Sequence, residues 1–106
     1  MNLKTFKSFY DLEEIGIERL YTENNDLYMI LDLNVYIELM ANGCRPVIDM
    51  DMRHLFIFKG FKGDIKLENV NVSNYRMEDR KLKFNANNIE IAIDSNEIEV
   101  IENFYK

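Results

Sequence analysis

The chain has 106 residues, of which 47% are hydrophobic and 30% charged, and its formal net charge at pH 7 is −6. This length predicts a single domain over residues 1–106, and the composition excludes the disordered class of protein. The sequence has no apolar run of 18 residues and no signal-peptide pattern at its start, so we expect a cytoplasmic protein without a membrane span.

The first twenty residues combine two hydrophobic patterns. Leu3, Phe6 and Phe9 have helical spacing, whereas Ile15 and Ile17 alternate as in a strand. We therefore expect a short N-terminal segment, which can be one short helix, and then a strand over about 14–21. The polar stretch 22–26 predicts a hairpin loop after that strand, because Asn and Asp side chains bond local backbone.

The clearest strand pattern covers residues 27–37. Apolar side chains of one parity recur there at every second position, which predicts a long, half-buried strand. Asn42 and Gly43 predict a turn after it, because both tolerate positive φ. Pro46 has no N–H to donate, so residues 47–50 can be an edge strand or a loop. We expect 41–52 to be the main irregular region.

The second half of the chain continues with short strands. Residues 53–58 are apolar at both parities, as in a strand covered on both faces. Gly60 and Gly63 predict a turn into a strand over 64–68. A looser stretch over 69–74 and a further strand near 75–77 should follow. The last expected strands share strict alternation and cover 82–84, 89–93 and 98–100.

These elements predict an all-β fold, with at most one short N-terminal helix. The expected architecture is an antiparallel meander of seven to eight strands, forming a sandwich or a partly open barrel. In residues 82–104, isoleucines alternate with Glu90, Asp94, Glu97 and Glu99. We expect these last strands to pair with one another and to present one solvated acidic face.

The charge is unevenly distributed along the chain. Residues 53–83 contain eight basic and four acidic residues, a balance of +4, which leaves −10 for the rest. An acidic surface repels a phosphate backbone and attracts a basic partner. Aromatic residues between the basic ones could stack on single-stranded nucleic acid, but their alternation indicates a core role. We therefore expect a protein partner and no nucleic acid.

The residue types needed for catalysis are scarce. His54 is the only histidine and Cys44 the only cysteine, so neither a multi-histidine metal site nor an internal disulfide can form. Asp49 and Asp51 would point to the same side of an extended segment, but their spacing lacks the glycine and terminal glutamate of a calcium loop. We expect no enzyme activity, no metal and no cofactor.

Three segments together resemble a protein family. They are residues 9–15, 26–31 and 55–67, within a likeness that covers about 8–102. The family consists of small β-rich bacterial proteins, and includes immunity proteins of polymorphic toxin systems as well as many members without an assigned role. Tyr10 stands where the family has histidine, and Phe61 where it has a small aliphatic residue. The resemblance implies a non-enzymatic protein that neutralises a toxin by covering its active site.

The sequence therefore predicts an accessory protein that binds another macromolecule, with a basic toxin as one such partner. The expected binding residues are carboxylates: Asp49, Asp51, Glu90, Asp94, Glu97 and Glu99. Three alternatives stay open. The first is a barrel-shaped carrier with a ligand cavity lined by Met29, Leu31, Leu33, Ile57 and Leu82. The second is a carboxylate hydrolase that uses Asp49, Asp51 or Glu13. The third is a homodimer or larger homo-oligomer joined through strand edges.

Overall fold

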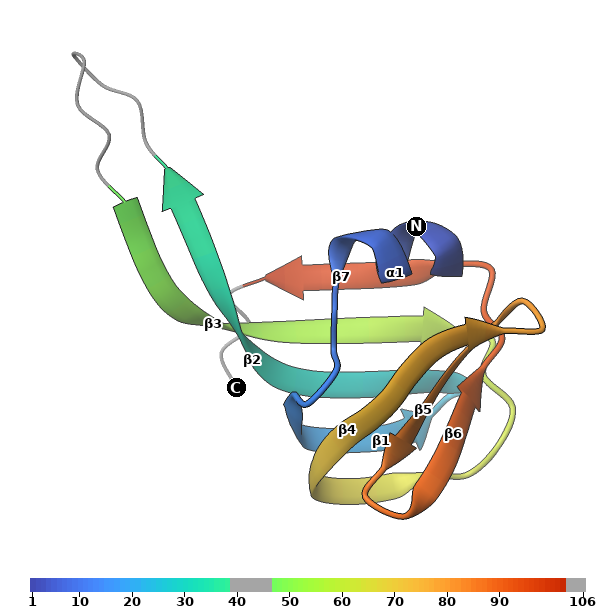
Figure 1. Cartoon of the computed structure of the whole chain (residues 1–106). Coiled ribbons are helices and arrows are strands. Elements are labelled where there is room, and N and C mark those ends of the chain that lie inside the picture. The colour runs from blue at the N-terminus through green and yellow to red at the C-terminus, as the bar shows by residue number, and fades with distance from the viewer. Residues whose placement is uncertain (39–46, 103–106) are drawn as a thin grey trace.

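Seven antiparallel strands form one sheet in the order β6-β5-β4-β1-β2-β3-β7, and one short helix precedes them (Figure 1). The elements are α1 (Leu3–Phe9), β1 (Gly16–Glu23), β2 (Asp26–Glu38), β3 (Val47–Lys59), β4 (Lys66–Glu78), β5 (Lys81–Ala86), β6 (Ile89–Ile93) and β7 (Ile98–Glu102). The computed structural model describes residues 1–38 and 47–102, with the backbone alone for 34–38 and 47–50. The predicted all-β class with a short N-terminal helix is confirmed.

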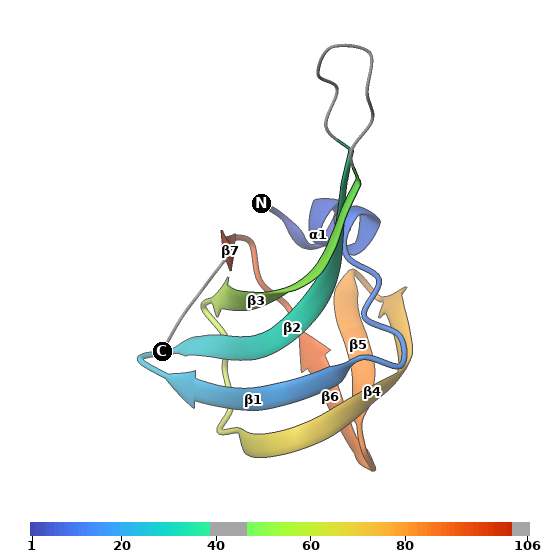
Figure 2. The ribbon, with the colours of Figure 1, turned by 90° about the vertical axis from the view of Figure 1, so that its left-hand side faces the viewer.

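The sheet curls because β4 belongs to two layers. Its first half, residues 66–71, pairs with β1, and its second half, residues 72–78, pairs with β5. Asn69 and Asn74 have φ of 51° and 54°, and the register shifts between Ser73 and Arg76, which bends the strand. Figure 2 shows the two halves folded over one another, without closure into a barrel.

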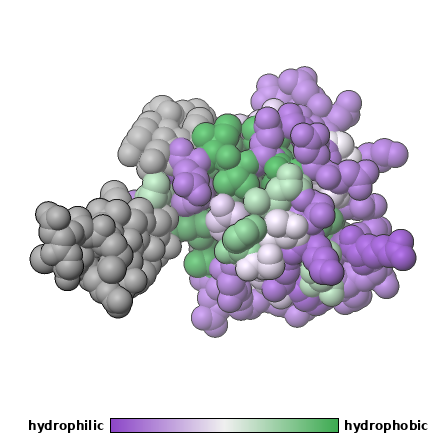
Figure 3. Space-filling model, turned by 90° about the horizontal axis from the view of Figure 1, so that it is seen from above, coloured by the Kyte–Doolittle hydropathy of each residue, from purple (hydrophilic) through white to green (hydrophobic). Residues whose placement is uncertain are grey.

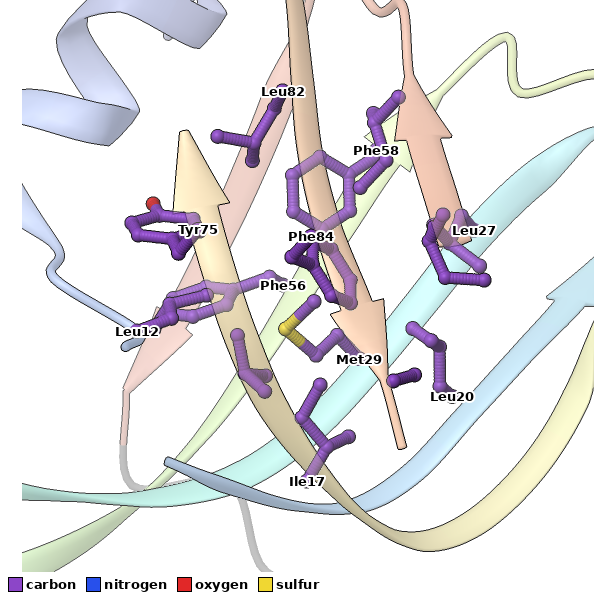
Figure 4. Packing of buried hydrophobic residues seen from close by; sticks show 14 of the residues in the cluster. Leu12, Ile17, Leu20, Leu27, Met29, Phe56, Phe58, Tyr75, Leu82 and Phe84 are labelled. Carbon is purple, nitrogen blue, oxygen red and sulfur yellow. The ribbon is translucent and has the colours of Figure 1, made fainter. Parts of the chain in front are cut away.

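The main core fills the space between the two halves of the sheet (Figure 4). β1, β2 and β3 contribute alternate side chains from one side, and β4, β5 and β6 from the other, because successive strand residues point to opposite faces. The largest fully buried side chains of these strands include Met29, Phe56, Phe58, Leu82 and Phe84. This packing explains the alternation in the sequence.

The N-terminal helix covers one opening of the curled sheet. The side chain of Asn2 caps it by accepting a hydrogen bond from Thr5 N–H at 2.8 Å. Leu3 and Phe6 are buried one turn apart, and the Phe6 ring packs edge-on against Phe56 at 4.8 Å. With seven residues α1 is far shorter than a membrane span, and no longer apolar helix occurs in the described part of the chain.

A second, smaller cluster lies on the outer face of the sheet. It consists of Ile30, Leu55 and Ile57, with Tyr21 and Tyr28 packed against it. The two tyrosine rings stack at 5.1 Å with an interplanar angle of 6°. This cluster explains why residues 53–58 are apolar at both parities, as the sequence predicted for a strand covered on both faces.

Two expectations about individual strands are wrong. Residues 47–52 are not irregular, since they form the start of β3 and pair with β2 up to Glu38. They pair with no other described strand, so the edge-strand alternative for 47–50 is confirmed. Residues 66–78 form one continuous strand and not two strands with a loose stretch between them. Pro46, Asn42, Gly43 and Cys44 lie outside the described residues.

The turn between β4 and β5 offers a stability prediction. Asp79 and Arg80 have φ of 53° and 65°, a pair of left-handed residues that favours glycine at the second position. Arg80→Gly should therefore raise the free energy of unfolding by about 1 kcal/mol. Asn25 has φ of 62° in the turn between β1 and β2, and Asn25→Gly should gain less, because Asn tolerates this conformation. Urea unfolding of both variants checks this, and equal gains would contradict it.

Tyr75 links β4 to the segment after α1, and its ionisation should weaken the fold. Its hydroxyl donates to the carbonyl oxygen of Tyr10 at 2.9 Å. Burial, and secondarily the charge of Asp11, raises the pKa of Tyr75 above the usual value of 10.0. A pKa that is higher in the folded state means that stability is fully present below about pH 10 and falls as pH rises above it.

We expect the free energy of unfolding to fall by about 1.4 kcal/mol per pH unit above about pH 10 through this one group. Tyr75→Phe should cost about 1 kcal/mol at pH 7, because one hydrogen bond is lost, and should make the alkaline decline shallower. Urea unfolding at pH 7, 9, 10 and 11 measures both effects. A difference between variant and native protein that stays constant over this range would contradict the expectation.

Candidate protein-binding edge

β7 forms one end of the sheet, and exposed carboxylates lie on it at Glu99 and Glu102 and just before it at Glu97. β7 pairs antiparallel with residues 54–58 of β3, in a register that sets Val100 opposite Phe56 and Glu99 opposite Ile57. Ile98 is buried in the core, whereas Glu99 and Ile101 are exposed. We call the side of β7 that faces away from β3 the β7 edge.

The turn into β7 is held by a buried serine. Ser95 Oγ lies 2.7 Å from the carbonyl oxygen of Lys59 and 2.8 Å from that of Glu97. The N–H of Lys59 also donates to the Glu97 carbonyl oxygen, at 2.9 Å. These bonds fix the backbone at Glu97 while its side chain stays exposed.

One lysine stands among the carboxylates at this end of the sheet. Lys59 Nζ lies 3.5 Å from Asp26 Oδ2 and 3.6 Å from Glu99 Oε2. Loss of hydration works against the charge of Lys59, but the two carboxylates outweigh it and raise the pKa of its ammonium group. Glu97 and Glu102 add two more exposed carboxylates, so the local charge is negative.

The N-terminus lies against the β7 edge. Ile98 N–H donates to the carbonyl oxygen of Met1 at 2.8 Å, and the Met1 ammonium donates to the carbonyl oxygen of Ile98 at 3.3 Å. In the view from above, apolar side chains gather in the middle of the surface, with hydrophilic ones around them (Figure 3). Exposed large apolar residues from these elements are Met1, Phe9 and Ile101.

The expected single acidic face is wrong, because the last two strands do not pair. β6 and β7 stand at opposite ends of the sheet order. Glu97 and Glu99 lie together at β7, whereas Glu90 lies on β6, 3.7 Å from the guanidinium of Arg76. Asp94 is exposed in the connection between β6 and β7.

The remaining predicted carboxylates lie elsewhere. Asp51 is exposed on β3, opposite Asn34 of β2. Asp49 belongs to β3, but its side chain lies outside the described residues. Glu13, a candidate for hydrolysis, accepts hydrogen bonds from Asn74 N–H at 2.9 Å and Tyr75 N–H at 2.7 Å. Both of its oxygens therefore bind the bend of β4.

His54 lies in β3, as the sequence predicted. It is 2% exposed, and its Nδ1 donates to the carbonyl oxygen of Met52 at 2.9 Å. The rings of Tyr10 and Phe56 pack beside it. Among the described residues, no three side chains of His, Cys, Asp or Glu gather closely enough to hold a metal ion.

The hollows on the described surface include four of about 260 to 770 Å³. The one of about 770 Å³ lies between α1, the β4–β5 turn and the loop before β7, and is lined in part by Lys4, Met77 and Arg80. Met29, Leu31 and Leu82, which the carrier hypothesis places around a cavity, line none of these four and are fully buried in the core. These three residues thus give no support to the carrier hypothesis, which stays a prediction.

Sequence analysis missed two parts of this edge, Glu102 and the Met1 bridge. Glu102 lies two residues beyond the end of the predicted strand 98–100, because Ile101 breaks the alternation there. The Met1 bridge joins residues 97 positions apart, and nothing local indicates such a contact. The run of acids after residue 90 was the one available signal.

Comparisons with family models, with curated proteins and with solved structures found no match to this chain.

Proposed function

We propose that this chain is a binding protein without catalytic activity and that its partner is a protein with a basic surface. One observation carries the proposal: the three exposed carboxylates of Glu97, Glu99 and Glu102 lie along one sheet edge, with Lys59 and the Met1 ammonium as neighbouring cations. Charge complementarity of this kind speeds association and disfavours wrong partners.

The resemblance described above narrows the kind of partner. In that family, immunity proteins neutralise toxins by covering their active sites. A toxin that acts on nucleic acid needs a basic surface to hold the phosphate backbone. An acidic chain with a net charge of −6 would compete for that surface. We therefore propose a basic toxin as the partner.

Capture from a lysate of the source cells tests the proposal. The immobilised protein should retain one basic partner at low salt and release it when salt is raised, because exposed charges are then screened. Glu97→Gln/Glu99→Gln should abolish retention. The matched control, Glu14→Gln/Glu68→Gln, removes two exposed charges elsewhere and should retain the partner.

Two results would overturn the proposal. The first is equal loss of the partner from both double variants, which would indicate general charge attraction. The second is the absence of a partner together with a rise in melting temperature on adding a metabolite. Since a ligand stabilises the state that binds it, that result would favour the carrier hypothesis.

A further inference from the structure

Backbone groups on the β7 edge are open and regularly placed. Ile98 directs both its N–H and its C=O away from β3, since both bond to Met1. Along a strand, the backbone groups of successive residues point to alternate sides, so every second residue shares this direction. Val100 and Glu102 therefore direct their N–H and C=O groups away from β3. Among the residues that the structure describes, Met1 alone bonds to this side of β7.

Met1 pairs with Ile98 as the first residue of an added antiparallel strand would. Met1 and Ile98 exchange two hydrogen bonds, as a hydrogen-bonded pair of antiparallel strands does. The bridge covers one residue of β7, and beyond it no described residue bonds to the edge. An extended segment lying in line with Met1 would continue the ladder to Val100 and Glu102.

The side chains around the open part of the edge combine charge with apolar surface. Glu99 is about half exposed and Glu102 is exposed, while Ile101 is 42% exposed between them. Glu97, Glu99 and Ile101 point to one face of the sheet, because side chains of successive strand residues alternate between the two faces. Val100 and Glu102 point to the other face. An incoming strand of alternating basic and apolar residues would set its basic side chains on the face of Glu97 and Glu99, and its apolar side chains beside the half-buried Val100. A second copy of this chain fits less well, because it would bring glutamates and a net charge of −6 to the same place.

The other end of the sheet lacks this combination. β6 also has an open edge, and Ile89 is 50% exposed there. Glu90 is the one carboxylate on β6, and it has Arg76 at 3.7 Å much as Glu99 has Lys59 at 3.6 Å. No terminal residue bridges to β6 in the described chain. The β7 edge is therefore the better docking strand for a basic segment.

We propose that the partner docks by adding an extended segment, rich in Lys or Arg alternating with apolar residues, antiparallel to β7. This inference rests on the proposed function and specifies its contact. Backbone hydrogen bonds to Val100 and Glu102 supply the affinity, and the flanking glutamates select the basic segment. Edge strands that are not blocked by proline, bulges or lysine are open to such pairing.

A blocked ten-residue peptide of alternating lysine and valine serves as the probe. We expect it to bind the whole protein and to shift the NMR amide signals of residues 98–102. The same sequence N-methylated at every second residue cannot complete the ladder and should bind at least ten-fold more weakly. A peptide of alternating glutamate and valine should not bind.

Glu102→Pro is the decisive variant. It removes an outward N–H without breaking a bond to β3, and proline is tolerated at such a position on an edge strand. We expect at least a ten-fold loss of peptide affinity with an unchanged melting temperature. Val100→Pro should have the same effect on binding, although its half-buried side chain makes it the less conservative change. The control, Glu90→Pro on β6, should leave peptide affinity unchanged.

The outcomes separate this inference from the proposed function. If the peptide shifts signals of β6, or binds Glu102→Pro as tightly as the native protein, strand addition at β7 is wrong. If a basic partner is captured through Glu97 and Glu99 while both proline variants retain it, the proposed function stands and strand addition falls. If the peptide binds as expected but no basic partner is captured, the proposed function is wrong. The edge then does not serve to dock a partner, although it can add a strand.

Discussion

Replacing Phe6 by alanine should lower the free energy of unfolding by about 3 to 5 kcal/mol. The Phe6 side chain is fully buried, and its ring packs against Phe56 at 4.8 Å and Phe58 at 5.3 Å. Truncation would leave a cavity where the helix covers the sheet. β3 could not move to fill this cavity, because it pairs with β2 on one side and β7 on the other. For a chain of this length the melting temperature should fall by more than 10 °C.

The matched control lies on the same helix. Phe9 is 69% exposed, so Phe9→Ala should change the free energy of unfolding by no more than about 0.5 kcal/mol. Urea unfolding at 25 °C measures both variants. A loss below about 1 kcal/mol for Phe6→Ala would show that α1 is not part of the cooperative fold. The bridge from Met1 to β7 would then have no fixed support.

Replacing Glu13 by alanine should cost about 1.5 to 3 kcal/mol, because two backbone N–H groups lose a charged acceptor. Asn74 N–H and Tyr75 N–H donate to the two oxygens of Glu13 at the bend of β4. Asn74 has φ of 54°, so its backbone cannot adopt the regular ladder that would supply other partners. The carboxylate replaces a neighbouring strand at this point.

Glu13→Gln should lose about half as much, since one oxygen remains as an acceptor and the charge is removed. Glu14→Gln is the control, because Glu14 is exposed like Glu13 but its carboxylate accepts none of the hydrogen bonds that hold the bend. Urea unfolding gives the losses, and hydrogen exchange at Asn74 and Tyr75 locates them. Equal effects of Glu13→Gln and Glu14→Gln would mean that general charge, and not these bonds, stabilises the bend.

The strands could be predicted from the sequence to the extent that their burial is regular. Residues 27–31 face a packed core with every second side chain, so their alternation is local and visible. The polar residues Asn69 and Asn74 resemble a loop in composition, and yet they lie within β4 at the positions where it bends. Tertiary pairing on both sides of β4 outweighs their low strand propensity.

The strand order could not be predicted, because it depends on contacts between distant segments. Consecutive strands often pair, and this expectation holds for β1 with β2, β2 with β3, β4 with β5 and β5 with β6. It fails between β3 and β4, since β4 pairs with β1, and at β7, which pairs with β3 and not with β6. Glu97 and Glu99 were therefore identified as acidic residues, but their separation from Glu90 was not.

The position of β7 also affects how the chain folds during synthesis. Residues 54–58 of β3 pair with β7, which leaves the ribosome after the other strands that the structure describes. Until then Leu55, Phe56 and Ile57 border an open edge, a state that favours association between nascent chains. A chain shortened after β6 would keep that edge open permanently. We therefore expect intact synthesis of β7 to be a condition for solubility as well as for the proposed binding.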